Sequence, residues 1–388
     1  VGAVDGPRVR IAGRWVLNFT SSNYLGLSHD PEVRERTAAT VRRWGSSLAM
    51  PRLLATDSLT AQLERKLAGL VHAEAALLFP STLHAAHDVL SLLAGDAGLI
   101  AIDERAYPIS LAAARSVAWP NGEMRRFQHD DPESLARLLA ERGQRDAVVI
   151  CDGVYPANGA PASVRAIGRV AASAGATVYV DDAHGLGVLG AHPGPAQPYG
   201  YGGGGTLRYS GAQQGNIAYV SSLSKALGVP LAFAAGPARF IEYLRLTSAS
   251  VTHSSPPCQL VVAAALATLD RQVACGDALR RRLLYNVRHF RAEANRLGLP
   301  LTSNSLFPIQ SIAFASPAAA IASGRRLRLH DIWPVLALRP EDHPTGATLR
   351  FVITALHTKE DIDEAIDALA RTAACQGRFD DPALEWTG

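Results

Sequence analysis

One lysine in the sequence stands where its amine could act as a nucleophile. Lys225 comes shortly after the apolar run 217–220, and the hydroxyl side chains Ser221, Ser222 and Ser224 lie between them. Burial lowers the pKa of a lysine, and the neutral amine can then form a Schiff base with an aldehyde. A lone lysine is usually an exposed charge, so the prediction depends on the position of Lys225 after a buried strand.

A carboxylate follows a second apolar run. Asp181, Asp182 and His184 come directly after the run 177–180. A buried carboxylate is costly unless it meets hydrogen-bond donors or a cation, and a protonated pyridine nitrogen is one such cation. Aspartate is common at strand ends, so this motif alone does not distinguish a site from an ordinary turn.

A third motif could hold a phosphate. Ser81, Thr82 and Leu83 join the apolar run 75–79 to a helical pattern. Free backbone N–H groups at a helix N-terminus bind phosphate, although the same residues could merely cap the helix. An amine for an aldehyde, a carboxylate for a ring nitrogen and a cup for a phosphate are the three attachments of pyridoxal 5'-phosphate (PLP). We therefore predict this cofactor, and we predict no metal site.

These motifs follow strands of one predicted sheet. Short apolar runs alternate with helical segments, which is typical of an α/β fold whose mostly parallel sheet is covered on both faces. Ligands of such sheets bind beyond the carboxyl ends of the strands, where all three motifs lie. The runs predicted as strands are 75–79, 98–102, 147–151, 177–180 and 217–220.

The flanking segments predict further elements. Residues 8–19 resemble a hairpin arm, and the N-cap residues at 56–58 begin a helix. After about residue 300 the order is strand, helix, strand, strand and a final helix, which starts with a capping box at Thr358 and Asp361. We predict an N-terminal arm (1–50), a large PLP-binding domain (51–272) and a smaller C-terminal α+β domain (273–388).

Two segments invite simpler interpretations. The glycine-rich stretch 199–205 is too short for a linker and is predicted to be a mobile loop. The basic run at 280–282 is predicted to lie on a solvated helix face, with an anion site as the less favoured alternative.

Composition limits the class of protein. The chain has 388 residues, of which 48% are hydrophobic and 19% charged, and its net charge is +3. These values predict two or three domains with a large core, and they argue against disorder and against nucleic acid as the main partner. Apolar runs such as 260–269 are too short to span a bilayer, and no secretory signal is visible at the start. Four cysteines, which we expect to be reduced thiols of a cytoplasmic protein, are Cys151, Cys258, Cys275 and Cys375.

The chain resembles the α-oxoamine synthase family of fold-type I PLP-dependent enzymes. The similarity extends over nearly the whole chain, and its most specific pieces are Asp-Asp-Ala-His-Gly at 181–185 and Ser-Lys-Ala-Leu-Gly at 224–228. The other matching segments are 22–27, 52–54, 63–64, 152–154, 255–257, 349–351 and 357–363.

The resemblance implies a role for each matching residue. Lys225 would form the Schiff base, Asp181 would pair with the ring nitrogen, and His184 would bond the ring hydroxyl oxygen. It also implies a homodimer with its active sites at the subunit interface. The remaining implied contacts are the cofactor phosphate with Ser81, Thr82, Leu83 and Ser222, the partner's phosphate with His253, and the amino-acid substrate with Asn23 and Arg350.

Several positions depart from the family pattern. Tyr107 stands where the family has a histidine stacked on the cofactor ring, and tyrosine can stack but is not a near-neutral acid or base. Thr82 replaces a glycine, Pro156 a serine and His253 a threonine, and Pro230 and Leu231 replace a glycine pair. The departures surround the cofactor, so we predict a divergent member with an unusual substrate or altered chemistry.

The family implies a PLP-dependent acyltransferase that condenses an amino acid with an acyl thioester, bound to coenzyme A or to a carrier protein. The reaction is expected to release CO₂ and to give an α-oxoamine. An aminotransferase, an aldolase or a replacement enzyme on the same scaffold stays open because of Tyr107 and Pro156. A non-catalytic binding protein is disfavoured because Lys225, Asp181 and His184 are all present.

Overall fold

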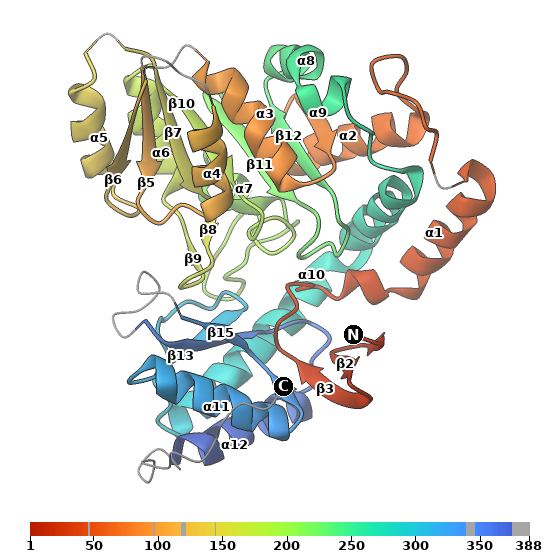
Figure 1. Ribbon diagram of the computed structural model, residues 1–388, viewed down its shortest axis with the longest axis vertical. Helices are drawn as coiled ribbons and strands as arrows, with labels where there is room; N and C mark the ends of the chain where they lie inside the picture. Colours follow the sequence, from red (N-terminus) through yellow and green to blue (C-terminus); the bar gives the residue numbers. More distant parts are fainter. Residues whose placement is uncertain (46, 96–97, 118–121, 144, 339–345, 375–388) are drawn as a thin grey trace. The chain divides into compact units, whose positions relative to one another are not determined.

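The structure is a computed structural model that describes residues 1–45, 47–95, 98–117, 122–143, 145–338 and 346–374. The chain forms two compact units (Figure 1). The larger unit comprises Ser22–Pro156 and Ala160–Arg282. The smaller unit comprises Val1–Ser21, Ala157–Gly159 and the chain from Leu283 onward. The predicted boundaries at 50/51 and 272/273 stay a prediction.

A seven-stranded sheet organises the larger unit (Figure 1). All its strand pairs are parallel except those of β12, which is antiparallel to both β11 and β4. The predicted α/β fold with a mostly parallel sheet is confirmed, and each of the five apolar runs is a strand. In spatial order the strands are β4 (Ala75–Phe79), β12 (Ala232–Gly236), β11 (Ile217–Ser222), β10 (Thr177–Asp181), β7 (Ala147–Asp152), β5 (Leu99–Asp103) and β6 (Glu123–Phe127).

Helices cover the sheet because its strands are apolar on both faces. All residues of β5, β7, β11 and β12 are buried. Alternate strand residues, such as Ile100 and Ile150, form one core with Val89 and Leu90 of α3, as the period of two along a strand requires. The helices of this unit are α1 (Pro31–Trp44), α2 (Ser58–Val71), α3 (Thr82–Ala94), α4 (Pro108–Ser116), α5 (Pro132–Ala140), α6 (Val164–Ser173), α7 (Gly205–Ser210), α8 (Ala238–Thr247) and α9 (Ala249–Thr252).

Shorter and longer elements complete this unit. A 3-10 turn η1 (Leu27–His29) precedes α1, and a small ribbon pairs β8 (Val154–Tyr155) with β9 (Ala160–Pro161). The long helix α10 (Gln259–Arg296) begins in the larger unit and continues into the smaller one. The predicted start of α2 is confirmed, since the Asp57 carboxylate accepts the backbone N–H groups of the first turn.

The smaller unit contains two sheets. The predicted arm is an antiparallel hairpin, and one sheet has the order β1 (Ala3–Asp5), β2 (Arg8–Ile11), β3 (Arg14–Asn18) and β14 (Ile332–Trp333). The other has the order β13 (Ile309–Ala313), β16 (Thr348–Val352) and β15 (Val335–Ala337), and the helices are α11 (Pro317–Leu329) and α12 (Lys359–Ala374). The capping box before α12 is confirmed, because the N–H of Thr358 donates to Asp361 Oδ2 over 2.9 Å and the N–H of Asp361 donates to Thr358 Oγ1 over 3.2 Å.

Two predictions need correction, one about the glycine-rich stretch and one about the first residue of the basic run 280–282. The glycine-rich stretch 199–205 is packed rather than free: Gly203 O accepts from Gly187 N at 2.8 Å, and Gly202 N donates to Asp277 of α10 at 3.1 Å. Arg280 is only 1% exposed, and its Nη1 donates to Gly187 O at 2.8 Å, so it supports this region instead of facing water. Arg281 and Arg282 are exposed, as predicted for this run. Sequence alone shows none of these three contacts, because each joins segments that are not neighbours in the chain.

No helix in the described part of the chain is long and apolar enough to cross a membrane. The cysteines at 151, 258 and 275 are free thiols, and Cys375 lies outside the described residues.

Candidate active site

A cavity of about 110 Å³ lies beyond the carboxyl ends of the strands in the larger unit. The segments that line it follow β4, β5, β7, β10 and β11, which is the edge where an α/β sheet binds its ligands. Five residues predicted from the sequence line it together, namely Thr82, Tyr107, Asp181, His184 and Lys225, and the other lining residues are Ile109, Asp152, Val154, Pro156 and Ala183.

Lys225 lies in the connection between β11 and the antiparallel strand β12. Its carbonyl accepts the N–H of Gly228 at 3.0 Å, and the φ of +68° at Gly228 is one that favours glycine. Burial lowers the pKa of the Lys225 amine, while the carboxylates of Asp181 and Asp152 oppose that shift. The fold thus provides a partly desolvated amine at the end of a buried strand.

Two buried carboxyl groups stand beside this lysine. Asp181 ends β10 and Asp152 ends β7, and they are Cα partners in the parallel pair. Burial raises the pKa of both, that of Asp152 well above its usual range, because Asp181 adds like-charge repulsion there. Two carboxyls that share one amine favour a further cation, and a protonated pyridine nitrogen meets that demand.

His184 is held by a buried tyrosine. The hydroxyl of Tyr24 lies 2.8 Å from His184 Nδ1, and Tyr24 is fully buried. This contact fixes the orientation of the imidazole within the cavity.

The N-terminus of α3 remains open for an anion. Ser81 is its N-cap residue, but its hydroxyl lies 2.8 Å from His84 Nδ1 and caps no N–H of the first turn. Thr82 begins the helix and lines the cavity. An uncapped helix N-terminus, a partly desolvated amine and a buried carboxylate all fit PLP.

Tyr107 lines the cavity from the start of α4. It is the N-cap residue of that helix and is 40% exposed. Its backbone N–H donates to both carboxylate oxygens of Asp152, at 3.2 and 3.1 Å. The predicted stacking of its ring on the cofactor stays a prediction.

The other predicted residues are not among those described as lining the cavity. Ser222 ends β11 and its hydroxyl accepts the N–H of Ser224 at 3.1 Å, while the Asn23 amide donates to Ser28 Oγ at 2.7 Å. Leu83 is 52% exposed. His253 is exposed beside a separate hollow of about 400 Å³, and Arg350 lies on β16 of the smaller unit.

Sequence reasoning missed Asp152 and Tyr24 as members of the site. Both lie in segments that matched the family, but no role was assigned to either residue. A signal for Asp152 was present, since two neighbouring buried strands, β7 and β10, each end in aspartate. Nothing local in the sequence indicates that Tyr24 reaches His184, because the contact joins segments far apart in the chain.

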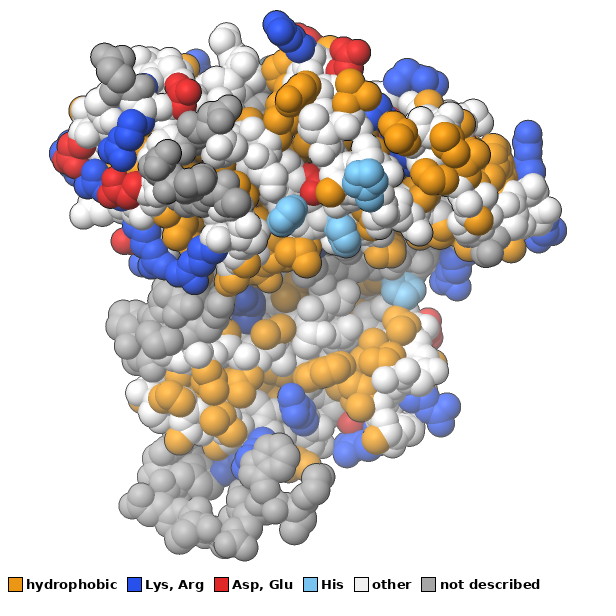
Figure 2. Space-filling model, turned by 45° about the horizontal axis from the view of Figure 1, so that its top comes forward, with side chains coloured by type: hydrophobic (Ala, Val, Ile, Leu, Met, Phe, Trp, Pro, Cys, Tyr) orange, Lys and Arg blue, Asp and Glu red, His pale blue; other side chains and the backbone are white. Residues whose placement is uncertain are grey.

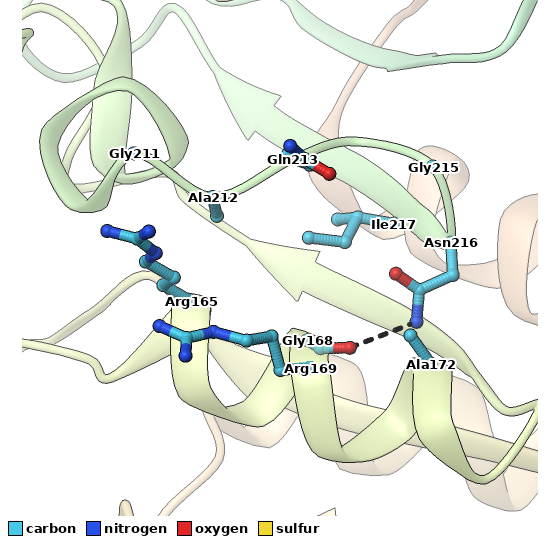
Figure 3. Close-up of a pocket in the computed structure, with 10 residues that line it drawn as sticks. All are labelled: Arg165, Gly168, Arg169, Ala172, Gly211, Ala212, Gln213, Gly215, Asn216 and Ile217. Carbon is cyan, nitrogen blue, oxygen red and sulfur yellow. Dashed lines mark hydrogen bonds between the residues drawn. The ribbon is translucent and has the colours of Figure 1, made fainter.

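A larger hollow of about 430 Å³ lies between α6 and residues 211–216, which precede β11 (Figure 3). It is therefore at the amino edge of the sheet, away from Lys225. Arg165 and Arg169 reach into it from α6, and Asn216 bonds back to the carbonyl of Gly168 at 3.3 Å. Its lining includes no acid and no nucleophile, so it lacks the groups on which the predicted chemistry depends.

Comparisons with known proteins agree with this geometry. The model of the family "Aminotransferase class I and II" matches residues 14–369. The 8-amino-7-oxononanoate synthase of Methylococcus capsulatus is 36% identical over 368 residues, which cover 94% of this chain and 90% of that protein. The corresponding enzyme of Symbiobacterium thermophilum is 32% identical with the same coverage.

Solved structures share the fold. Serine palmitoyltransferase of Sphingomonas wittichii superposes with a TM-score of 0.86 at 24% identity, over 96% of this chain and 91% of that one. The 8-amino-7-oxononanoate synthase of Francisella tularensis superposes with a TM-score of 0.76 at 22% identity, over 93% and 99%. The chain belongs to the aminotransferase class I and II family and, within it, to the α-oxoamine synthases. The predicted family, fold type, PLP cofactor and acyltransferase class are confirmed.

Proposed function

We propose that the protein condenses an amino acid with an acyl thioester and releases CO₂. The observation that supports this most directly is the cavity that brings Lys225, Asp181 and His184 together, in a chain that matches 8-amino-7-oxononanoate synthases over more than nine-tenths of its length. The Cα–carboxylate bond breaks and a Cα–acyl bond forms. The thiolate leaves, takes up one proton, and the product is an α-oxoamine.

When bound, PLP supplies the electron sink for negative charge at the substrate Cα. Lys225 would hold the cofactor aldehyde, and its amine would move protons at the substrate Cα. Asp181 keeps the proton on the ring nitrogen, because a buried carboxylate favours a neighbouring cation. His184, oriented by Tyr24, would bond the ring hydroxyl oxygen. The phosphate would be held by Ser81, Thr82, Leu83 and Ser222.

Arg350 and Asn23 are proposed to bind the amino-acid substrate. A guanidinium matches a carboxylate in a planar, bidentate pair. This assignment rests on the family resemblance, since Arg350 belongs to the smaller unit and the cavity is lined from the larger one.

We also propose a cytoplasmic homodimer, with His253 near the partner's cofactor phosphate. Exposed apolar side chains on the larger unit include Leu53 at 61% and Leu54 at 74%. Figure 2 shows apolar side chains interspersed with histidines on one face of the molecule. Exposed apolar surface of this kind is typical of an interface, and sedimentation of the purified protein measures whether a dimer forms.

The decisive experiment supplies amino acids with a panel of acyl thioesters and measures free thiol and CO₂. Arg350→Ala is expected to raise KM for the amino acid roughly ten- to a hundred-fold, since a charge-assisted pair contributes about 1.5–3 kcal/mol. KM for the thioester should change little. The matched control is Arg328→Ala, an exposed arginine of α11 in the same unit, which should leave both constants unchanged.

A second candidate is an aminotransferase, which Tyr107 in place of the family's histidine favours. If the amino group moves to a keto acid while no thiol is released, the condensation is wrong and this candidate replaces it.

A further inference from the structure

Asp182 is a fully buried carboxylate that does not line the cavity. Its partners are three uncharged donors. Oδ2 accepts the backbone N–H of Thr206 at 2.7 Å and the hydroxyl of Tyr219 at 2.7 Å, and Oδ1 accepts the hydroxyl of Thr206 at 2.5 Å. The carboxylate therefore joins β10 to β11 and to the start of α7.

Three glycines from separate segments enclose this carboxylate. A Cβ at Gly153, Gly185 or Gly205 would lie 2.2, 2.1 and 2.3 Å from its oxygens. Such distances are far below van der Waals contact, so each position requires glycine as long as Asp182 keeps its place. The glycines come from the segment after β7, the loop of His184 and the glycine-rich stretch.

The main chain of Asp182 bonds to β11, which leads to Lys225, and to the loop that carries His184. Its N–H donates to Val220 O at 2.8 Å, and its carbonyl accepts the hydroxyl of Ser221 at 2.9 Å. Val220 and Ser221 belong to β11, which leads to Lys225. The same carbonyl accepts the N–H of Leu186 at 3.2 Å, which closes the loop that carries His184.

The charge of Asp182 also acts on its neighbours. Ionisable groups that interact with it include Asp181, the last residue of β10, Tyr219 on β11, Cys151 on β7, and Lys225. Burial raises the pKa of Asp182 to about 6, and the hydrogen bonds from Thr206 oppose that rise. Burial lowers the pKa of Lys225, and above this pH the charged Asp182 carboxylate opposes that shift together with Asp181 and Asp152.

We propose that Asp182 is a positioning residue for the reaction: its carboxylate ties the ends of β10 and β11 to α7 and so holds Asp181, His184 and Lys225 in their mutual arrangement. This role rests on the proposed function where turnover is measured, and it makes separate predictions for the protein without cofactor.

The test uses Asp182→Asn, which can keep the shape and lose the charge. Asparagine has a single acceptor oxygen, which can still accept from the Thr206 N–H and the Tyr219 hydroxyl, but its amide nitrogen would face the Thr206 hydroxyl, whose proton then loses its acceptor. We expect kcat to fall about ten- to a hundred-fold with KM within about twofold, and with PLP still attached to Lys225. The decrease of kcat below pH 6, expected in the wild type as Asp182 takes up a proton, should disappear.

Thr206→Val gives an independent, graded change. It removes one donor that stabilises the carboxylate, so the pKa of Asp182 should rise and the acidic limb of the kcat profile should move to higher pH. A residue with a purely structural role would not move this limb. Thr206→Val also keeps the proposal testable if Asp182→Asn fails to fold.

The protein without cofactor provides a second readout. The folded pKa of Asp182 lies above its unfolded value of 3.8, so the native state holds an extra proton between pH 4 and 6. Unfolding midpoints in urea should therefore fall as pH rises through that window in the wild type, and they should fall less steeply in Asp182→Asn.

Asp88→Asn is the matched control. Asp88 is a buried aspartate of α3 that accepts the N–H of Ser250 at 3.0 Å and does not line the cavity. The Asp88→Asn variant should have a lower free energy of unfolding than the wild type, and the acidic limb of its kcat profile should stay at the same pH. If Asp182→Asn behaves in the same way, with kcat and pH profile of the wild type, the positioning role is wrong. A wild type that releases no thiol contradicts the proposed function instead, and the unfolding data then decide on Asp182 alone.

Discussion

Charged side chains are buried at the carboxyl edge of the seven-stranded sheet and exposed at its amino edge. At the carboxyl edge, Asp152, Asp181 and the Lys225 amine are withdrawn from water, and their pKa values shift accordingly. At the amino edge, Arg165 and Arg169 stand exposed around a larger hollow (Figure 3). The difference teaches that the size of a hollow and the presence of charge do not mark the site of chemistry. The site of chemistry is marked instead by desolvation and by the convergence of several strand ends.

Lys225→Ala should produce the largest effect at the carboxyl edge. Without the amine the protein cannot bond the cofactor aldehyde, so the visible absorbance of the attached cofactor should vanish and kcat should fall roughly a thousand-fold or more. Circular dichroism should stay unchanged.

The control for this variant is Lys66→Ala, which removes a lysine paired with Asp270 on the surface. Borohydride reduction followed by peptide mapping identifies the modified lysine directly. A label on Lys66 or Lys359 would show that Lys225 is the wrong residue.

Asp181→Asn should have the next largest effect. The cofactor should stay attached, but the ring nitrogen would lose its proton, and kcat should fall roughly a hundred-fold or more. Asp182 cannot take over, because its carboxylate is bonded to Thr206 and Tyr219. Turnover near the wild-type value would contradict the assignment of Asp181.

The double variant Arg165→Ala with Arg169→Ala should have the smallest effect. The two arginines are exposed and four residues apart on α6, so their removal relieves like-charge repulsion of about 0.2–0.5 kcal/mol. Steady-state kinetics should match the wild type within about twofold, and the melting temperature should not decrease. A tenfold loss of kcat would mean that the amino edge takes part in the reaction and that the comparison fails.

Much of the fold could be predicted because its signals are local. Apolar runs marked five strands, Asp57 marked the start of α2, and Thr358 with Asp361 marked the start of α12. Strands β6 and β12 were not predicted. β6 is an edge strand with the charged residues Glu123, Arg125 and Arg126, so it lacks a continuous apolar run.

Only part of the site could be predicted from the sequence, because several of its contacts join residues that are far apart in the chain. Lys225 and Asp181 were found because each lies at or shortly after the end of a buried strand. The roles of Tyr24 and Arg280 depend on hydrogen bonds to residues more than ninety positions away, and no periodicity or capping pattern encodes such bonds. The family resemblance supplied the remaining site residues, and it could not show how Asp182 is held.

The antiparallel strand β12 has a consequence for the order in which the chain folds. β11 and β12 are joined by the short connection that contains Lys225, so this hairpin forms from neighbouring residues. β4, which leads to Ser81 and the start of α3, enters the sheet only through β12, where Phe79 is the Cα partner of Ala232. β4 and β12 are far apart in the chain, so their pairing closes a long loop. Closing that loop costs more entropy than forming the β11–β12 hairpin, and it is slower. During synthesis β4 and the start of α3 must therefore wait for β12, so this edge of the sheet is completed only after more than half of the chain has left the ribosome.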